Sequence, residues 1–144
     1  MANNFCSPLR VEFVKPREWI ILEPFEYHLG SPHGWEFVRI EPGFVTDFAS
    51  IPRPLWSIWP PTGSYGKAAV IHDALYVLPY VQRADGAMRR IVRREADAIF
   101  NEGMTVLGVN GFTRRTLYAG IRMAGWRAWG RYRAAEAGAR QDEA

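Results

Sequence analysis

A histidine and an aspartate lie side by side at positions 72 and 73, in the otherwise apolar run AAVIHDALY that ends at Tyr76. An isolated charge in an apolar environment costs several kcal/mol, so both side chains need partners. Imidazole exchanges protons near neutral pH, and a histidine held by a carboxylate is typical of sites that activate water. His72 and Asp73 are therefore the first candidates for chemistry in this chain.

The downstream segment EADAIF supplies a carboxylate for His72, at Asp97. Successive residues on a helix diverge by about 100°, so His72 and Asp73 point in different directions, whereas His72 and Tyr76 share a face. Two antiparallel helices joined by a short connection would bring Asp97 to that face. We then expect His72 to act as a general base, Asp97 to orient it, and Asp73 to bind a cation or a water. The same residues can instead form a buried structural network, and their spacing leaves both interpretations open.

A third group of candidates lies in the proline-rich stretch GFVTDFASIPRPLW and just after it. Asp47 can serve as a further metal ligand, and Ser50 as a nucleophile activated by His72. Asp47 and Ser50 can also bond their own backbone and shape a tight turn before the next proline. The segment PPTGSYG adds Gly63 and Gly66 directly before the histidine run.

The first third of the chain predicts β-strands. The segments 11–14, 19–29 and 35–42 are rich in aromatic and β-branched residues, and we expect them to form a small antiparallel sheet. Residues 43–66 contain four prolines and little periodicity. We therefore expect an irregular loop there, with one short helical turn near residues 54–58.

The rest of the chain has helical periodicity. Apolar residues recur at helical spacing from residue 67, and Pro79 limits this first helix soon after Leu78. A second helix is expected over about 88–107, and a third over about 113–137 with Thr113 as its cap. The expected fold class is α+β, with a small N-terminal antiparallel sheet followed by an irregular loop and a three-helix half.

A length of 144 residues suits one domain and is long enough to bury a core. We expect a single domain over 1–144, made of a β-rich part at 10–45, an irregular loop at 46–66, a helical part at 67–137 and a loose tail at 138–144. No apolar run approaches the roughly 20 residues that span a bilayer, and the first residues lack the pattern of a signal peptide. The single cysteine, Cys6, cannot form an internal disulfide, and we expect no role for it.

The positive charge of the chain is concentrated near its C-terminus. Residues 112–144 hold seven arginines and three acidic residues, whereas residues 1–111 hold eleven basic and twelve acidic residues. The expected third helix can therefore bind phosphates or anionic lipid headgroups, and tryptophans suit a membrane interface. The residues of this surface are Arg114, Arg115, Arg122, Trp126, Arg127 and Trp129. An amphipathic helix with packed tryptophans explains the same pattern, and no nucleic-acid-binding motif accompanies it.

Three motifs occur in a fixed order, TDFASIP, HDALY and ADAIF. This order resembles a family of phage and prophage proteins classed as a domain of unknown function, with the pattern TDxASIP, HDxLY and ADxIF. The resemblance covers residues 43 to about 126. It implies a phage or prophage origin, hence the cytoplasm of a bacterial host or a virion as location, and other phage proteins as partners. It fixes no activity.

The arrangement His-Asp-x-x-Tyr on one helix, facing an aspartate on the next, also resembles the catalytic helix pair of phospholipase A2. The resemblance implies that His72 activates water, that Asp73 binds Ca²⁺, and that Tyr76 and Asp97 hold the histidine. The glycine-rich loop that completes the calcium site of those enzymes has no counterpart at the corresponding distance in this sequence. Ca²⁺ takes about six to eight oxygens, of which one carboxylate supplies at most two.

Two functions are therefore open. The first is a phage-encoded hydrolase with a phospholipid ester as substrate. The second is a non-catalytic phage structural or tail-assembly component, in which the same residues form a buried polar clamp. Metal-dependent phosphohydrolases also carry adjacent histidine and aspartate, but they need an upstream histidine on a helix. The upstream His28 and His33 lie in strand-like sequence, which disfavours that third class.

Overall fold

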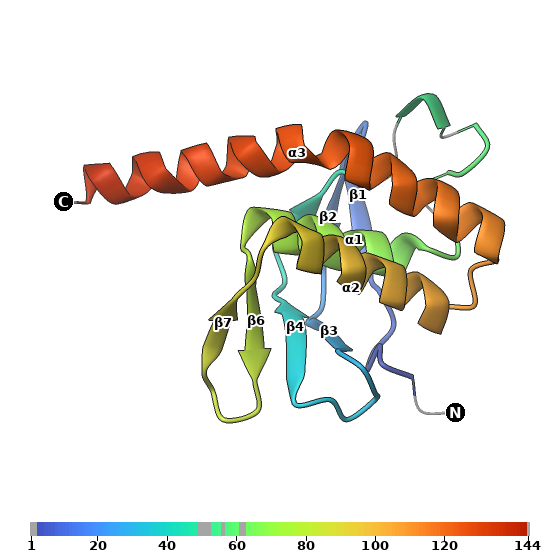
Figure 1. Cartoon of the computed structure of the whole chain (residues 1–144), viewed down its shortest axis with the longest axis horizontal. Helices are drawn as coiled ribbons and strands as arrows, with labels where there is room; N and C mark the ends of the chain where they lie inside the picture. The colour runs from blue at the N-terminus through green and yellow to red at the C-terminus, as the bar shows by residue number, and fades with distance from the viewer. Residues whose placement is uncertain (1–2, 49–52, 56, 61–62, 144) are drawn as a thin grey trace.

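The computed structural model describes residues 3–48, 53–55, 57–60 and 63–143. Two antiparallel sheets and three α-helices make up this part of the chain, and the predicted α+β class is confirmed. Figure 1 shows the three helices lying together, with the last helix on the opposite side of the other two from the strands in the lower half of the picture. None of the described helices is long and apolar enough to cross a membrane.

The first sheet has three strands in the order β1-β2-β5. These are β1 (Val11–Lys15), β2 (Glu18–Ile21) and the short β5 (Val45–Thr46). Strand β5 runs antiparallel to β2 and contacts the first helix, so the residues that follow it lie close to that helix. Phe48 follows with a φ of 51°, a left-handed conformation that is uncommon for a bulky residue. It is held there by burial and by edge-to-face packing on Trp19.

The second sheet has four strands in the order β3-β4-β6-β7. These are β3 (Phe25–His28), β4 (Glu36–Ile40), β6 (Tyr80–Arg83) and β7 (Met88–Arg90). The prediction of one strand over 19–29 was wrong, because the chain leaves the first sheet after Ile21 and enters the second at Phe25. Pro24, which has no N–H for a central ladder, lies between them.

The prediction of a helix starting at residue 88 was also wrong. Residues 80–90 form the β6–β7 hairpin, which is added to the N-terminal strands after the first helix. Its turn contains Asp85 and Gly86, with Gly86 at a φ of 87° and Asp85 accepting a hydrogen bond from the backbone N–H of Ala87. Asp-Gly is a strong hairpin dipeptide, so the sequence did contain this information.

The helices are α1 (Gly66–Val77), α2 (Arg93–Val106) and α3 (Gly111–Asp142), preceded by the 3-10 turn η1 (Arg53–Leu55). Helix α3 extends to Asp142, so most of the predicted loose tail is helical, and its C-terminal part projects beyond the body in Figure 1. Its N-cap is Asn110 rather than the predicted Thr113, since the Asn110 side chain accepts a hydrogen bond from the Thr113 N–H.

Helix α1 lies at the centre of the molecule, in contact with α2, α3 and both sheets. This position explains the apolar run of the sequence, because α1 buries residues on almost every side. Helix α2 approaches it closely at Gly103, where an added Cβ would lie 3.1 Å from the Cβ of Ala68. His72 and Asp73 thus lie in a helix that is packed on almost every side.

Candidate functional site

His72 and Asp97 meet across α1 and α2. The imidazole Nε2 lies 2.7 Å from Asp97 Oδ1, and both side chains are buried, with 2% of His72 and 0% of Asp97 exposed. The close α1–α2 contact makes this meeting possible, and Phe100 of α2 packs against the imidazole ring at 5.0 Å between centroids. The pair is therefore held rigidly in the core.

Asp97 accepts hydrogen bonds from four side chains. Tyr76 Oη lies 2.7 Å from the same Oδ1 as His72, while Arg122 Nη1 and Arg93 Nη1 lie 2.5 Å and 3.3 Å from Oδ2. Burial alone would raise the pKa of Asp97, but the hydrogen bonds from His72, Tyr76 and Arg122 outweigh it and hold the pKa below its ordinary value. Asp97 is thus an ionised carboxylate at neutral pH.

The ionised state of Asp97 determines the tautomer of His72. A carboxylate only accepts hydrogen bonds, so Nε2 carries the proton, and in the neutral imidazole Nδ1 carries the lone pair. Tyr76 likewise remains a donor, because burial and its hydrogen bond to Asp97 raise the pKa of its hydroxyl. Tyr76 therefore orients Asp97 and contacts His72 only through the rings, 4.2 Å apart.

A cavity of about 210 Å³ borders His72. Asp47 and Asp73 both line it, and Thr46 Oγ1 donates a hydrogen bond of 2.7 Å to Asp73 Oδ2. Strand β5 thus supplies Thr46, which orients the Asp73 carboxylate, and Asp47 follows this strand directly and lines the same cavity. The remaining walls come from α1 and α3, at Tyr76, Gly120, Ile121, Ala124, Gly125, Ala128, Arg131 and Tyr132.

Tyr132 and Arg131 bring polar groups to the α3 wall of this cavity. Burial raises the pKa of the Tyr132 hydroxyl, and the negative charges of Asp47 and Asp73 raise it further. The cavity therefore combines an imidazole, two carboxylates and a phenol that remains protonated. Such a group of side chains can bind and activate a water, and its carboxylates can contribute to a cation site.

A family model described as a protein of unknown function, DUF1353, matches residues 19–121. The chain belongs to the DUF1353 family. The match confirms the predicted membership of a family of unknown function, and it includes His72, Asp73, Tyr76 and Asp97. It ends directly before Arg122, which binds Asp97 from α3. No curated protein and no solved structure matches the chain.

Other predicted site residues of this DUF1353 protein lie elsewhere. Ser50 lies outside the residues that the structure describes. Gly63 and Gly66 line a different depression, together with Leu9, Phe48 and Lys67. The two glycines are therefore not part of the wall around His72.

The predicted lipid-facing residues of α3 divide between two sides of the helix. Arg122 turns inward to Asp97, and Trp129 packs edge-on against Tyr76 at 5.2 Å between centroids. Arg114 bonds Thr105 of α2, whereas Arg115 borders an apolar groove. The guanidinium of Arg127 lies over Trp126, of which 57% is exposed.

Four residues around this DUF1353 site were not predicted from the sequence to belong to it. Arg93 precedes Asp97 by one helical turn, and this i to i+4 spacing of opposite charges was visible in the sequence. Thr46 adjoins the predicted Asp47 in the TDFASIP motif. Arg131 and Tyr132 had no such local pattern, because only the crossing of α3 over α1 brings them to the cavity.

Proposed function

We propose that this DUF1353 protein is a phage-encoded hydrolase that cleaves a carboxylic ester, with a phospholipid as the favoured substrate. The observation that carries the proposal is the 2.7 Å hydrogen bond from His72 to the buried Asp97, beside a cavity that also holds Asp47 and Asp73. Asp97 favours the tautomer in which His72 Nδ1 accepts a proton, as a general base requires.

The reaction needs only one water and the ester. A water in the cavity gives a proton to His72 Nδ1 while its oxygen attacks the ester carbonyl carbon. Asp97 stabilises the imidazolium that forms. The imidazolium then gives this proton to the leaving alkoxide as the ester C–O bond breaks, which yields one acid and one alcohol and restores the neutral histidine.

Calcium is an additional component of this proposal. Asp73 and Asp47 are the residues that would hold it, and together they supply at most four of the roughly six to eight oxygens that Ca²⁺ takes. The donor set thus fits a hard cation only if waters or substrate oxygens complete it. A bound Ca²⁺ would polarise the ester carbonyl.

The size of the cavity supports a substrate of which only the reacting part enters. About 210 Å³ is less than the roughly 300–1,000 Å³ of a site that encloses a whole ligand. A second, open groove of about 750 Å³ lies on the neighbouring side of α3, and both share Gly120 as a wall. The groove is lined by Leu55, Phe112 and Met123 with Arg115 at its border, a chemistry that suits an acyl chain and a phosphate.

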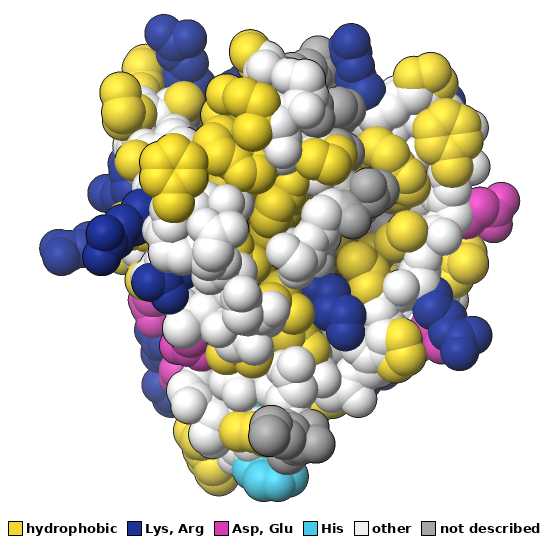
Figure 2. Space-filling view, turned by 90° about the vertical axis from the view of Figure 1, so that its right-hand side faces the viewer, with side chains coloured by type: hydrophobic (Ala, Val, Ile, Leu, Met, Phe, Trp, Pro, Cys, Tyr) yellow, Lys and Arg dark blue, Asp and Glu magenta, His cyan; other side chains and the backbone are white. Residues whose placement is uncertain are grey.

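The exposed surface near the start of α3 supports the proposal that the substrate comes from a membrane. Phe112 and Met123 are 74% and 79% exposed, and Ile58 after η1 is 65% exposed. Figure 2 shows this end of the molecule, where hydrophobic side chains gather in its upper half and Lys and Arg side chains stand around them. Apolar side chains bordered by basic ones are typical of proteins that bind anionic bilayers.

A second candidate function is favoured by the burial of the pair. With 2% of His72 exposed and four donors on Asp97, the network also suits a non-catalytic phage structural or tail-assembly component. In that case the residues would hold α1, α2 and α3 together as a polar clamp, and they would contribute only to the stability of the fold.

The deciding experiment is hydrolysis of phosphatidylglycerol vesicles by the full chain, with Ca²⁺ and with a chelator. We expect release of fatty acid by the wild type and a loss of at least about 100-fold in His72→Gln, because general-base catalysis contributes about 10²- to 10⁴-fold. His33→Gln is the matched control, since His33 is exposed and lies away from the cavity.

Rates are compared per folded molecule, with folding followed by circular dichroism. A wild type without activity on vesicles and on soluble short-chain esters would overturn the hydrolase. If His72→Gln then lowered the melting temperature while His33→Gln did not, the clamp would be the remaining function.

A further inference from the structure

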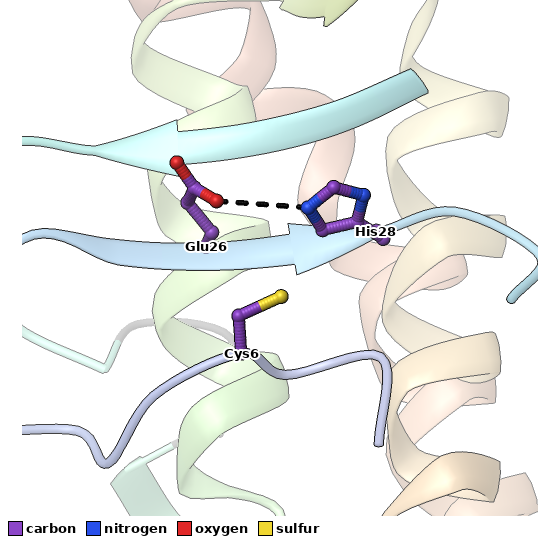
Figure 3. Close-up of side chains that lie close together, drawn as sticks. All are labelled: Cys6, Glu26 and His28. Carbon is purple, nitrogen blue, oxygen red and sulfur yellow. Dashed lines mark ion pairs between the residues drawn. The ribbon is translucent and has the colours of Figure 1, made fainter. Parts of the chain in front are cut away.

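Three side chains that can bind a metal converge on the outer face of the second sheet. The ligand atoms of Cys6, Glu26 and His28 all lie within 4.8 Å of one another. Figure 3 shows Glu26 and His28 side by side on β3, with the Cys6 sulfur directed toward them from the neighbouring N-terminal segment. This group lies apart from the His72 cavity and comes from a different part of the fold.

Strand register produces this convergence. The N-terminal segment pairs antiparallel with β3 through a bridge between Phe5 and Tyr27, and both of these side chains point into the core. Their neighbours must therefore point to the opposite face, because side chains alternate along a strand. The Cys6 N–H donates to the Glu26 carbonyl, which places Cys6 directly opposite Glu26 and diagonal to His28.

The imidazole of His28 has the orientation of a metal ligand. Its Nδ1 lies 3.0 Å from the carbonyl oxygen of Gly34, and since a carbonyl only accepts, Nδ1 carries the proton. The lone pair of the neutral ring is then on Nε2, which faces Glu26 Oε2 at 3.6 Å. A histidine that donates its second nitrogen to a backbone carbonyl is the usual arrangement at metal sites.

Neighbouring residues fix the other parts of the group. Arg39 Nη1 binds Glu26 Oε1 at 2.6 Å, so this arginine engages one carboxylate oxygen while Oε2 faces His28. Phe37 stacks on the His28 ring at 5.2 Å between centroids and 21° between planes. The rotations of the imidazole and the carboxylate are thus limited before any ion arrives, which lowers the entropic cost of binding.

We infer that Cys6, Glu26 and His28 form a zinc site. Thiolate, imidazole and carboxylate are the three ligand types that Zn²⁺ takes in proteins, whereas Ca²⁺ and Mg²⁺ prefer oxygen alone. Ligand atoms about 2.0–2.3 Å from one Zn²⁺ lie about 3.5 Å apart, which small side-chain rotations within the 4.8 Å group provide. A water completes the tetrahedron, and the ion fastens the N-terminal segment to β3.

The test uses the single cysteine of the chain. Co²⁺ replaces Zn²⁺ in such sites, and a thiolate-to-cobalt charge-transfer band can arise in this protein only from Cys6. We expect one equivalent of Co²⁺ to produce the band in the wild type, one equivalent of Zn²⁺ to abolish it, and Cys6→Ser to lack it.

Zinc affinity is then measured by competition with a chromogenic chelator. We expect Cys6→Ser and His28→Gln to bind Zn²⁺ more than about 100-fold more weakly, because loss of even an outer-shell partner costs about 10- to 100-fold. His33→Gln is the matched control and keeps the wild-type affinity. Cys6 is exposed, so Cys6→Ser tests the site even if His28→Gln does not fold.

A wild type that shows no charge-transfer band at stoichiometric Co²⁺ would overturn the zinc site. Equal zinc affinity of Cys6→Ser and the wild type would do the same. Neither result would bear on ester hydrolysis at His72, because the two groups share no residue.

Discussion

Asp97 accepts hydrogen bonds from side chains of all three helices. It receives His72 from its partner helix α1, Arg93 from its own helix, and Arg122 from α3. Loss of the Asp97 charge would remove the anion with which Arg93 and Arg122 pair, and partly buried cations that lose their anion are costly. Asp97 thus links the three helices through one charge.

We predict that Asp97→Asn lowers the free energy of unfolding by about 3 kcal/mol at neutral pH, as is typical when one partner of a buried charged network is removed. Urea unfolding followed by tryptophan fluorescence measures this. Asp85→Asn, in the exposed β6–β7 turn, is the control and should change stability by less than about 0.5 kcal/mol. An equal effect of the two substitutions would contradict the central role of Asp97.

The stabilisation by Asp97 should depend on pH in one direction. Its folded pKa lies below the ordinary value, so the stabilisation is complete above the unfolded pKa of about 3.9 and is lost as the pH falls through the lower folded pKa. The contribution of the Asp97 charge to the difference in unfolding free energy between wild type and Asp97→Asn should therefore shrink as the pH falls below about 4.

Acid also titrates carboxylates that do not contact Asp97, and their effects cancel in this difference. Glu36 is one of them, since the hydrogen bond from Arg89 lowers its pKa to about 2. A gap between the two proteins that remained unchanged down to pH 2 would show that the charge of Asp97 does not provide the stabilisation. Chemical denaturation at a series of pH values supplies the data.

At the scale of elements, the crossing of α3 over α1 determines the site. Gly125 permits this crossing, because a Cβ there would lie 2.5 Å from Tyr76 Oη and 3.4 Å from Arg93 Nη1. Helix α3 also fixes the end of α1, since Arg133 Nη2 donates to the carbonyls of Tyr76 and Val77 at 2.7 Å and 2.9 Å. Small and cationic residues of one helix thus position the tyrosine of another.

We predict that Gly125→Ala lowers the free energy of unfolding by about 1–3 kcal/mol, because overpacking outweighs the gain in helix propensity. Gly130→Ala is the matched control on the same helix, where an added Cβ meets nothing within 4 Å. It should raise stability by up to about 1 kcal/mol. Opposite signs for the two alanines, measured by urea unfolding, would confirm the close crossing, and equal gains would contradict it.

At the scale of the whole molecule, α3 is longer than the part of it that packs against the other elements. Its last contacts with the body come from Arg133 and from Glu136, which pairs with Arg90 of β7 at 2.8 Å. Beyond them the described residues of the helix are exposed, and Figure 1 shows this end projecting away from the other elements. The end of α3 therefore adds little to the stability of the fold.

We predict that the free energy of unfolding of a chain ending at Glu136 differs from that of the full chain by less than about 0.5 kcal/mol, because only exposed residues are lost. A chain ending at Gly130 should lose about 2 kcal/mol or more, because charge-assisted hydrogen bonds contribute about 1.5–3 kcal/mol each. Thermal and urea unfolding of the two chains provide the comparison. A large loss in the longer chain would show that the projecting end has a role in the fold.

The fold class and the pairing of His72 with Asp97 could be predicted from local patterns in the sequence. His72 and Asp97 each lie in a segment with helical periodicity, and an ionisable residue in an apolar helix must find a partner nearby. The structure joins the two at 2.7 Å. Their chemical roles stay predictions until hydrolysis is measured.

Only the tertiary structure decided where strands and distant cations lie. The strand predicted over 19–29 divides between two sheets, and the hairpin at 80–90 joins strands from the start of the chain, since sheet pairing is not encoded in a short window. The hydrogen bond of Arg122 to Asp97 and the proximity of Cys6 to His28 likewise come only from the tertiary structure. Helical periodicity can be recognised within a short stretch of sequence, whereas strand register and helix crossing depend on the packing of the whole core.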